Sequence, residues 1–309
     1  MLCKIYFQKV LHIHFQLACL EIIIQKNQLP NFYGVIANHN HNTMEKHLLQ
    51  YLADARKAVK ATANYIAGQA LRLHEIEIQE KSVHNLVSEV DVKAENYLVE
   101  MLSKALPEAG FITEENSIAQ QKKEFTWVID PLDGTTNFLH GLPFYSISVG
   151  LLHGDEPVLG IVHDVARNEQ FYGYKNGGAF LNDTPLNILQ PKSLHDSLIV
   201  LGFFYNETDA LEKFLNIMRQ LINQSRGFRR LGSAALDLAY VAAGRCDGFF
   251  EFNLNAWDVC GGALLVKEAG GLISDFKNTD NYIFGKEIIA ARPGVYDELL
   301  ALIKIEMSH

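Results

Sequence analysis

Apolar and small residues recur at three- and four-residue steps directly after Met44. The positions are Leu48, Leu52, Ala55, Val59 and Ala63, with charged residues between them. This spacing places one apolar stripe along a helix and predicts a helix over 45–72. A polar turn near Lys81 is expected next, followed by a second helix over about 92–106.

Short β-like runs come after these helices, separated by turn-forming Gly, Asn and Asp residues. The runs cover 110–113, 126–130, 145–153, 157–163, 170–174 and 179–181. They predict an α+β first half built on a largely antiparallel, meandering sheet.

The pattern changes after a boundary that we place near 190–195. Strands are then predicted at 197–204, 247–251, 272–275 and 288–290, and helices at 209–224, 234–243, 257–269 and 296–305. Strands that alternate with helices indicate a second, α/β layer.

Residues 1–43 differ from the rest of the chain. They hold three lysines, one glutamate and four histidines, with no aspartate or arginine. We expect them to form a non-core extension, consistent with a gene-model artefact and a true start at Met44. The core domain is then 44–309, and His39 and His41 are expected in a solvated polar linker rather than in a metal site.

Composition narrows the possible functions. The 309 residues include 27 Lys and Arg against 36 Asp and Glu, which gives a net charge of −9. This balance disfavours nucleic-acid binding through phosphate neutralisation and suits cation binding if carboxylates converge. The four cysteines form no CxxC pair, so a reducing, cytoplasmic environment is expected. No apolar run is long enough to span a bilayer.

The strongest chemical signal is the segment 127–137, WVIDPLDGTTN. An apolar strand ends in Asp130, a proline turns the chain, and a second carboxylate follows at Asp133. Gly134 permits a tight bend, and the residues after it offer hydroxyls and backbone N–H groups. Carboxylates beside an anion cradle are what metal-dependent phosphoryl transfer requires.

Two further segments carry acidic residues, one at the end of a predicted strand and one at the start of a predicted helix. Glu114 and Glu115 end a short β run, which by itself is typical of a solvated loop. Asp258, in AWDVCGGA, stands at a predicted helix start, where a helix cap and a metal ligand are equally compatible readings.

Together these three segments resemble the inositol monophosphatase family of metal-dependent, lithium-sensitive phosphatases, from about Met44 to the C-terminus. The segments 232–240, GSAALDLAY, and 244–251, GRCDGFFE, resemble its bacterial, SuhB-like branch. The resemblance implies a layered α-β-α-β-α sugar-phosphatase fold and a homodimer. It also implies Mg²⁺-dependent hydrolysis of inositol 1-phosphate to myo-inositol and phosphate.

The resemblance also implies roles for individual residues. The Mg²⁺ ligands would be Glu114, Asp130, the Leu132 carbonyl, Asp133 and Asp258. The substrate contacts would be Asp133, Gly134, Thr135, Ser233, Ala234, Glu251 and Asp258. Thr135 paired with Glu114 would orient the attacking water. Asp91 would lie near the metal–water network, although a helix cap explains it equally well, and Lys81 matches a loop lysine near the site or is simply solvated.

Two positions depart from the family pattern. Thr113 stands where glycine is frequent, and Asp164-Val165 replaces Asp-Pro. Neither change removes an implied ligand, so they bear on loop geometry and substrate fit.

Alternative functions remain open at this stage. Related enzymes handle fructose 1,6-bisphosphate, NADP⁺, histidinol phosphate or 3′-phosphoadenosine 5′-phosphate. Relatives in the same branch act as non-catalytic partners of RNA polymerase or ribosomal-RNA transcription complexes. Strong direct RNA binding is not expected from the acidic chain.

Overall fold

The computed structural model describes residues 30–75, 78–82, 85–202 and 208–307. The chain divides into two compact units, residues 1–49 and 50–309. All elements of the candidate site lie in the second unit. That residues 1–43 are a non-core extension stays a prediction.

The long helix α2 runs from Pro30 to Ala70. The expected helix over 45–72 is present, but the expected polar linker before it is wrong for residues 38–43, whose backbone is helical. An existing helix extends at low cost, because each added residue gains one hydrogen bond. Proline has no N–H and is tolerated at the first helical position, which agrees with the start at Pro30.

A seven-stranded sheet forms the first half of the second unit, in the order β3-β4-β5-β6-β7-β8-β9. The strands are β3 (Gly110–Thr113), β4 (Phe125–Asp133), β5 (Ser146–His153), β6 (Glu156–Asp164), β7 (Glu169–Tyr174), β8 (Gly178–Leu181) and β9 (Thr184–Pro185). The predicted antiparallel meander is confirmed from β4 onward, whereas β3 pairs with β4 in parallel. The helix α4 (Thr135–Leu139) follows β4 directly.

A five-stranded sheet forms the second half, in the order β11-β10-β12-β14-β13. Its strands are β10 (Ile199–Leu201), β11 (Phe228–Arg229), β12 (Gly248–Phe252), β13 (Leu272–Ser274) and β14 (Glu287–Ala291). The helices of this half are α5 (Thr208–Gln224), α6 (Ala234–Ala242), α7 (Ala256–Glu268) and α8 (Val295–Met307). The predicted α/β alternation is therefore confirmed. The short 3-10 turns η1 (Leu73–Glu75) and η2 (Leu194–Asp196) complete the helical segments.

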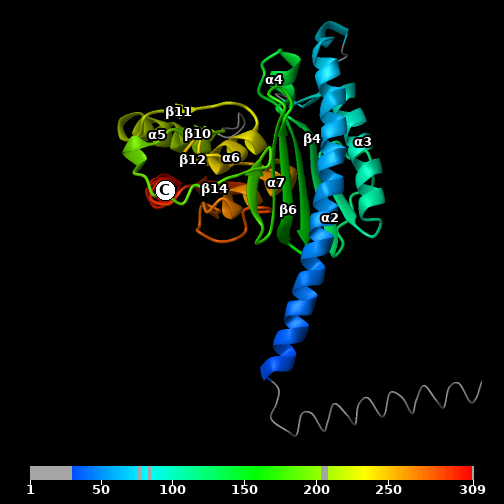
Figure 1. Ribbon diagram of the computed structural model, residues 1–309. Coiled ribbons are helices and arrows are strands. Elements are labelled where there is room, and N and C mark those ends of the chain that lie inside the picture. The colour runs from blue at the N-terminus through cyan, green and yellow to red at the C-terminus, as the bar shows by residue number, and fades with distance from the viewer. Residues whose placement is uncertain (1–29, 76–77, 83–84, 203–207, 308–309) are drawn as a thin grey trace, which may run out of the picture. The chain divides into compact units, whose positions relative to one another are not determined.

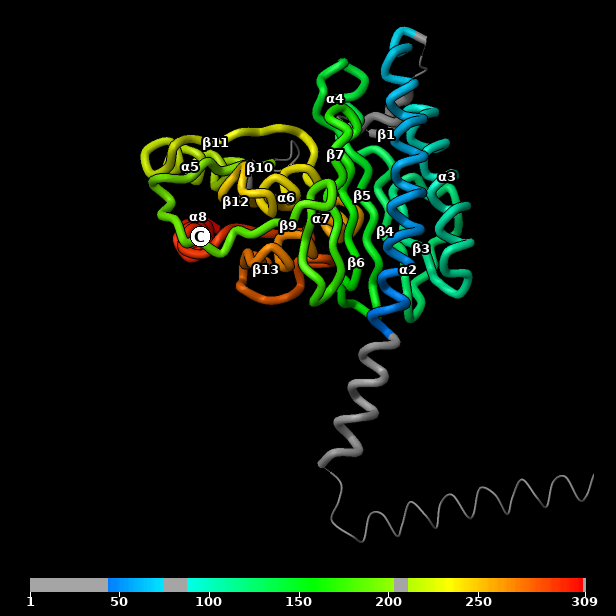
Figure 2. The backbone as a smooth tube through the Cα atoms, viewed as in Figure 1, coloured from blue at the N-terminus to red at the C-terminus, as the bar shows by residue number. Residues whose placement is uncertain are grey.

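Within the unit 50–309 the elements stack as helices, sheet, helices, sheet, helices, which confirms the expected layered fold (Figure 1). Residues 50–70 of α2 and the helix α3 (Glu89–Ala105) cover one face of the seven-stranded sheet. The helices α6 and α7 lie between the two sheets, and α5 and α8 cover the far face of the five-stranded sheet (Figure 2). One apolar core fills the middle layer, and a second lies between the five-stranded sheet and α5 and α8.

Glycines allow α7 to lie unusually close to the seven-stranded sheet. Gly150 of β5 pairs directly with Gly160 of β6. A Cβ at Gly160 would lie 2.3 Å from the carbonyl oxygen of Gly261, and one at Gly150 would lie 2.3 Å from Sγ of Cys260. Because side chains at these positions would push the helix away, the glycines set the position of α7 and of the Asp258 that it carries.

The polar segment near Lys81 is a hairpin rather than a simple turn. Strands β1 (Ile78–Ser82) and β2 (Asn85–Ser88) pair antiparallel. The side chain of Lys81 lies outside the described residues, so its expected place beside the site stays a prediction. In the part of the chain that the structure describes, no helix is long and apolar enough to cross a bilayer.

Candidate active site

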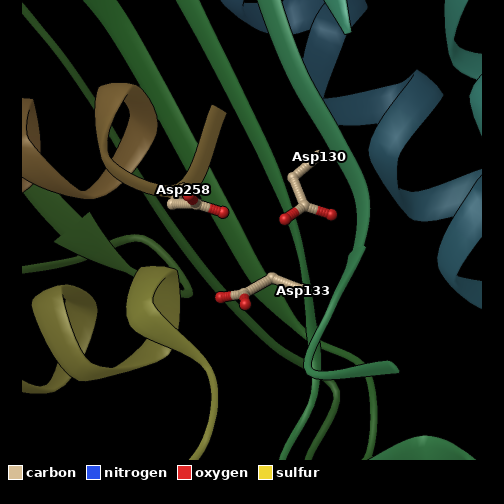
Figure 3. Close-up of side chains that lie close together, drawn as sticks. All are labelled: Asp130, Asp133 and Asp258. Atoms are coloured by element: carbon tan, nitrogen blue, oxygen red, sulfur yellow. The ribbon is translucent and has the colours of Figure 1, made fainter. Parts of the chain in front are cut away.

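Three aspartates from two distant parts of the chain converge at one end of the seven-stranded sheet (Figure 3). Asp130 and Asp133 come from the end of β4, and Asp258 comes from the first turn of α7. One carboxylate oxygen of each lies within 4.8 Å of the others. The backbone pairing of β4 with β5 is irregular between Asp130 and Asp133, which brings both carboxylates to the same site.

Each carboxylate is held by hydrogen bonds from backbone or hydroxyl groups. The N–H of Leu132 donates to Oδ1 of Asp130 at 2.9 Å. Asp133 accepts hydrogen bonds through Oδ2 from the Ser233 hydroxyl at 2.6 Å and the Ala235 N–H at 2.8 Å. The N–H of Asn255 donates to Oδ2 of Asp258 at 2.6 Å, as part of the capping box that begins α7.

Burial raises the pKa of all three aspartates. Burial contributes most at each, and the neighbouring carboxylates add to it at Asp130 and Asp258. The pKa of Asp133 rises to about 6, although the hydrogen bonds from Ser233 and from the backbone of α6 oppose the shift. The pKa of Asp258 rises to about 8. Carboxylates this close together favour a shared cation.

Glu114 lies beside this cluster because of the parallel pairing of β3 with β4. Thr113 pairs with Ile129, and the N–H of Glu114 donates to the Ile129 carbonyl at 3.2 Å. Glu114 therefore follows β3 at the level where Asp130 follows on β4. Its charge is the first neighbouring contribution to the raised pKa of Asp130.

The donor set fits a hard divalent cation. Mg²⁺ binds oxygen ligands at about 2.1 Å, so two ligands on opposite sides of the ion are roughly 4.2 Å apart. The spacing of the three carboxylates is compatible with that value. The residues that could hold a metal are thus Asp130, Asp133 and Asp258, with Glu114 beside Asp130.

Asp91 belongs to the capping box of α3, and its expected place near a metal–water network stays a prediction. It is the third residue of α3 and caps it, since the N–H and hydroxyl of Ser88 donate to its Oδ2 at 2.9 and 2.6 Å. Its Oδ1 lies 2.9 Å from Oγ1 of Thr135. Burial is the largest effect on the pKa of Asp91, and it raises that pKa. The Thr135 hydroxyl thus contacts Asp91, and the expected pairing of Thr135 with Glu114 around an attacking water stays a prediction.

The turn after Asp133 brings backbone groups close to the aspartate cluster. Gly134 has φ of +94°, a backbone conformation in which a residue with a side chain is strained. It directly precedes Thr135, the first residue of α4. The hydroxyl of Thr135 also lies 3.0 Å from the Leu132 carbonyl oxygen, the expected backbone ligand. Thr135 can donate its single proton to either acceptor.

The expected substrate residues lie on α6 and β12. Ser233 is the N-cap of α6 and contacts Asp133, and Ala234 is the first residue of that helix. Glu251 lies on β12, and burial raises its pKa to about 8. The negative charge of Glu251 adds to the raised pKa of Asp258. The structure thus brings the expected residues from β4, α4, α6, β12 and α7 into one neighbourhood.

Glu95 is a residue of this neighbourhood that sequence reasoning missed. It is fully buried on α3 and accepts hydrogen bonds from the Thr113 hydroxyl, the Glu115 N–H and the Ser117 N–H at 2.9, 2.8 and 2.7 Å. These bonds hold the segment that carries Glu114. A glutamate on the apolar face of a predicted helix was the available signal.

The same network accounts for the departure at position 113. The Thr113 side chain is buried and bonded to Glu95, and it also accepts from the Gln120 amide at 3.0 Å. A glycine could make neither side-chain contact. The other departure places Val165 after Asp164, whose buried carboxylate the Tyr240 hydroxyl contacts at 3.2 Å.

Arg230 and Asp237 were also missed. The positive charge of Arg230 lowers the pKa of both Asp133 and Glu251 against the effect of burial. Asp237 is buried on α6, where burial and the charge of Glu251 raise its pKa well above the ordinary value. Their nearness to the site arises from packing between α6, β11 and β12, which local sequence does not reveal.

Comparison with known proteins agrees with this geometry. Residues 48–306 match the model of the inositol monophosphatase family. The chain belongs to that family. It is 40% identical to "Nus factor SuhB" of Pseudomonas aeruginosa, over 81% of this chain and 94% of that protein.

Solved structures of the family have the same fold. The structure of the SuhB protein of Bartonella henselae superposes with a TM-score of 0.77 at 35% identity, covering 80% of this chain and 96% of that one. The Thermotoga maritima IMPase superposes with a TM-score of 0.74 at 31% identity, covering 82% and 96%. Membership of this family supports phosphatase activity.

Proposed function

We propose that this protein is a Mg²⁺-dependent phosphate monoester hydrolase whose substrate is inositol 1-phosphate. The observation that carries the proposal is the convergence of Asp130, Asp133 and Asp258, with Glu114 beside them. These residues would hold the metal. Bound Mg²⁺ would neutralise charge on the phosphoryl oxygens and lower the pKa of water.

Thr135 and Asp91 have the arrangement of a proton-accepting pair. When Oγ1 of Thr135 donates to Oδ1 of Asp91, its lone pairs can accept a hydrogen bond from an attacking water. The water proton would pass to Oγ1 while the hydroxyl proton moves to Asp91. The new P–O bond forms as the bond to the inositol oxygen breaks, and the departing alkoxide takes a proton from solvent water. The raised pKa of Asp91 makes its carboxylate a better proton acceptor.

The remaining residues would bind and orient the substrate. Backbone N–H groups of Gly134 and Thr135, at the start of α4, are suited to receive phosphoryl oxygens. Glu251 and the Ser233–Ala234 segment supply acceptors and donors for ring hydroxyls. A carboxylate that accepts hydroxyl hydrogen bonds favours a polyol over a nucleotide.

A phosphate-release assay tests this function. We expect turnover of inositol 1-phosphate that requires Mg²⁺, is inhibited by Li⁺, and exceeds turnover of fructose 1,6-bisphosphate, NADP⁺ and 3′-phosphoadenosine 5′-phosphate. Asp133→Asn should abolish hydrolysis, because it removes a charge from the metal cluster. Asp155→Asn, at a side chain that is 73% exposed, is the matched control. Wild-type turnover by Asp133→Asn would refute the assignment.

A second candidate function is a non-catalytic role in a transcription complex. It is favoured by the relatives called "Nus factor SuhB", of which the example from Pseudomonas aeruginosa is 40% identical. Co-purification with RNA polymerase would test it, comparing the wild type with Asp133→Asn. Equal recovery of polymerase by both would support a role that does not depend on hydrolysis, and absence of polymerase from both would reject it.

A further inference from the structure

A cavity of about 790 Å³ lies on the other face of the seven-stranded sheet from the aspartate cluster. Its walls are residues 53–64 of α2 and residues of β6, β7 and the turns beside them. His163 of β6 faces this cavity, whereas its neighbour Asp164 faces α6 through Tyr240. Side chains of adjacent strand residues point to opposite faces, so this cavity and the candidate active site are separated by the sheet.

The charged groups that line the cavity are predominantly positive. Arg56, Lys57 and Lys60 line it from α2, and Asp183 is the acidic residue among its described lining residues. Neutral hydrogen-bonding groups come from Asn64, Asn168, Gln170 and Asn182. Two of the three cations have acidic partners, since Arg56 pairs with Asp183 and Lys57 with Asp54, whereas Lys60 contacts the neutral Asn168.

Two of these cations are already held in place. Nε of Arg56 donates to Gln170 at 2.8 Å and Nη2 donates to Asp183 at 3.0 Å. Its guanidinium also lies 3.7 Å from the centre of the Tyr172 ring. Lys60 is half-buried and donates to the side-chain oxygen of Asn168. An ammonium has three N–H donors, so this single contact leaves Lys60 capacity for a ligand.

His163 provides an independent sign of a ligand. Its side chain is 1% exposed, and its Nδ1 has no hydrogen-bond partner among the described residues. A buried polar atom without a partner costs stability unless a bound group satisfies it. Burial and the charge of Lys60 lower the pKa of His163 to about 4, so the ring is neutral at pH 7 and offers one donor and one acceptor.

We propose that this cavity binds a small, multiply charged anion, with Arg56 and Lys60 pairing with its negative groups and His163 hydrogen-bonding to it. The volume is that of a typical metabolite pocket. A concave site fixed by a stacked guanidinium suits a compact ligand rather than an extended polymer. Phosphorylated metabolites and polycarboxylates share this chemistry, and the experiment distinguishes them.

The test measures binding of two probes, inorganic phosphate and tricarballylate, to the full chain by calorimetry and by NMR of the histidine rings. Divalent ions are first removed with a chelating resin, so that the aspartate cluster repels both anions. We expect saturable binding at one site per chain and a change in the His163 ring resonances, assigned with His163→Gln. The probe that binds more tightly identifies the source of the anion.

Variants locate the site. Lys60→Glu should weaken binding at least tenfold, and Lys104→Glu, a matched change at an exposed lysine of α3, should alter it less than twofold. If Lys60→Glu fails to fold, Lys57→Glu serves instead, because that side chain is 72% exposed, and a loss of threefold or more is expected. Non-saturable binding, unchanged His163 resonances, or equal effects of the pocket and control variants would overturn the proposal.

Discussion

Oγ1 of Thr135 lies 2.9 Å from Oδ1 of Asp91, and this contact joins the turn after β4 to the first turn of α3. The other carboxylate oxygen of Asp91 accepts from Ser88, so the capping bonds of α3 orient the oxygen that faces Thr135. One aspartate therefore both completes the capping box of α3 and contacts a hydroxyl at the candidate active site.

This contact leads to a prediction for Thr135. Thr135→Ala should lower kcat by about 10²- to 10⁴-fold, the usual contribution of a positioned proton-transfer group. KM for inositol 1-phosphate should change little, because the backbone N–H groups remain. Thr135→Ser keeps the hydroxyl and should retain most of the activity. Steady-state kinetics of both variants check this, and equal losses in Thr135→Ala and Thr135→Ser would contradict it.

Glu95 is expected to position Glu114 without touching substrate. In Glu95→Gln the side-chain amide would replace one of the acceptors used by Thr113, Glu115 and Ser117. We expect the Mg²⁺ concentration for half-maximal activity to rise by about 10- to 100-fold, as when outer partners of metal ligands are lost. A Mg²⁺ titration of activity measures this.

The matched control for that titration is Glu100→Gln, on the same helix, where the side chain is 66% exposed. It should leave the Mg²⁺ requirement unchanged. The positioning role of Glu95 is rejected if the two variants need the same Mg²⁺ concentration.

Close packing of α7 on the sheet predicts a stability effect at Gly160. In Gly160→Ala the new Cβ would lie 2.3 Å from the Gly261 carbonyl oxygen, so strand and helix must separate. We expect the free energy of unfolding to fall by about 1–3 kcal/mol, as in other overpacked cores. Asp258 should also move, which lowers activity in the folded fraction. Urea unfolding and activity assays measure the two effects.

Gly68→Ala is the control for this substitution. Gly68 lies within α2, and a Cβ there would meet nothing within 4 Å. It should stabilise the protein by about 0.4–1 kcal/mol, because alanine restricts the unfolded chain. A Gly160→Ala protein as stable as the wild type would show that α7 does not depend on the glycine contact.

The raised pKa values of Asp133, about 6, and of Glu251 and Asp258, about 8, predict how stability depends on pH. Without divalent ions the folded state holds these protons at higher pH than the unfolded chain, where carboxyl pKa values are about 4. Their contribution to the free energy of unfolding therefore falls as pH rises from about 4 to 8. Mg²⁺ should bind best to the deprotonated cluster, so it should raise Tm more at pH 8 than at pH 5.5.

Thermal unfolding at the two pH values, with and without Mg²⁺, checks this expectation. Asp258→Asn removes one of the titrating groups and should reduce the loss of stability with pH. His163 has the opposite effect on stability. Its pKa is lowered to about 4 in the folded state, so its contribution to the free energy of unfolding rises as pH increases from about 4 to 6.5. The same Tm increase from Mg²⁺ at both pH values would contradict the predicted coupling.

Local sequence was sufficient for most elements and for the two aspartates of β4. Short β-like runs separated by turn-forming residues predicted β5 to β8, and β5 and β6 are buried along almost their whole length. The helices α5 to α8 were also predicted from local sequence. The acidic segment 127–137 is contiguous, so its turn chemistry was visible directly. The hairpin of β1 and β2 was missed, because its strands are short and polar.

Only the tertiary structure decided which carboxylates meet. Asp258 reaches Asp130 because Gly150 and Gly160 admit α7 against the sheet, and that approach depends on contacts across 100 or more residues. Thr135 contacts Asp91 for the same kind of reason, since the packing of α3 against β4 sets the distance. Residue type and periodicity specify what each segment can form, whereas side-chain neighbours follow from how the layers pack, a long-range property that no local pattern contains.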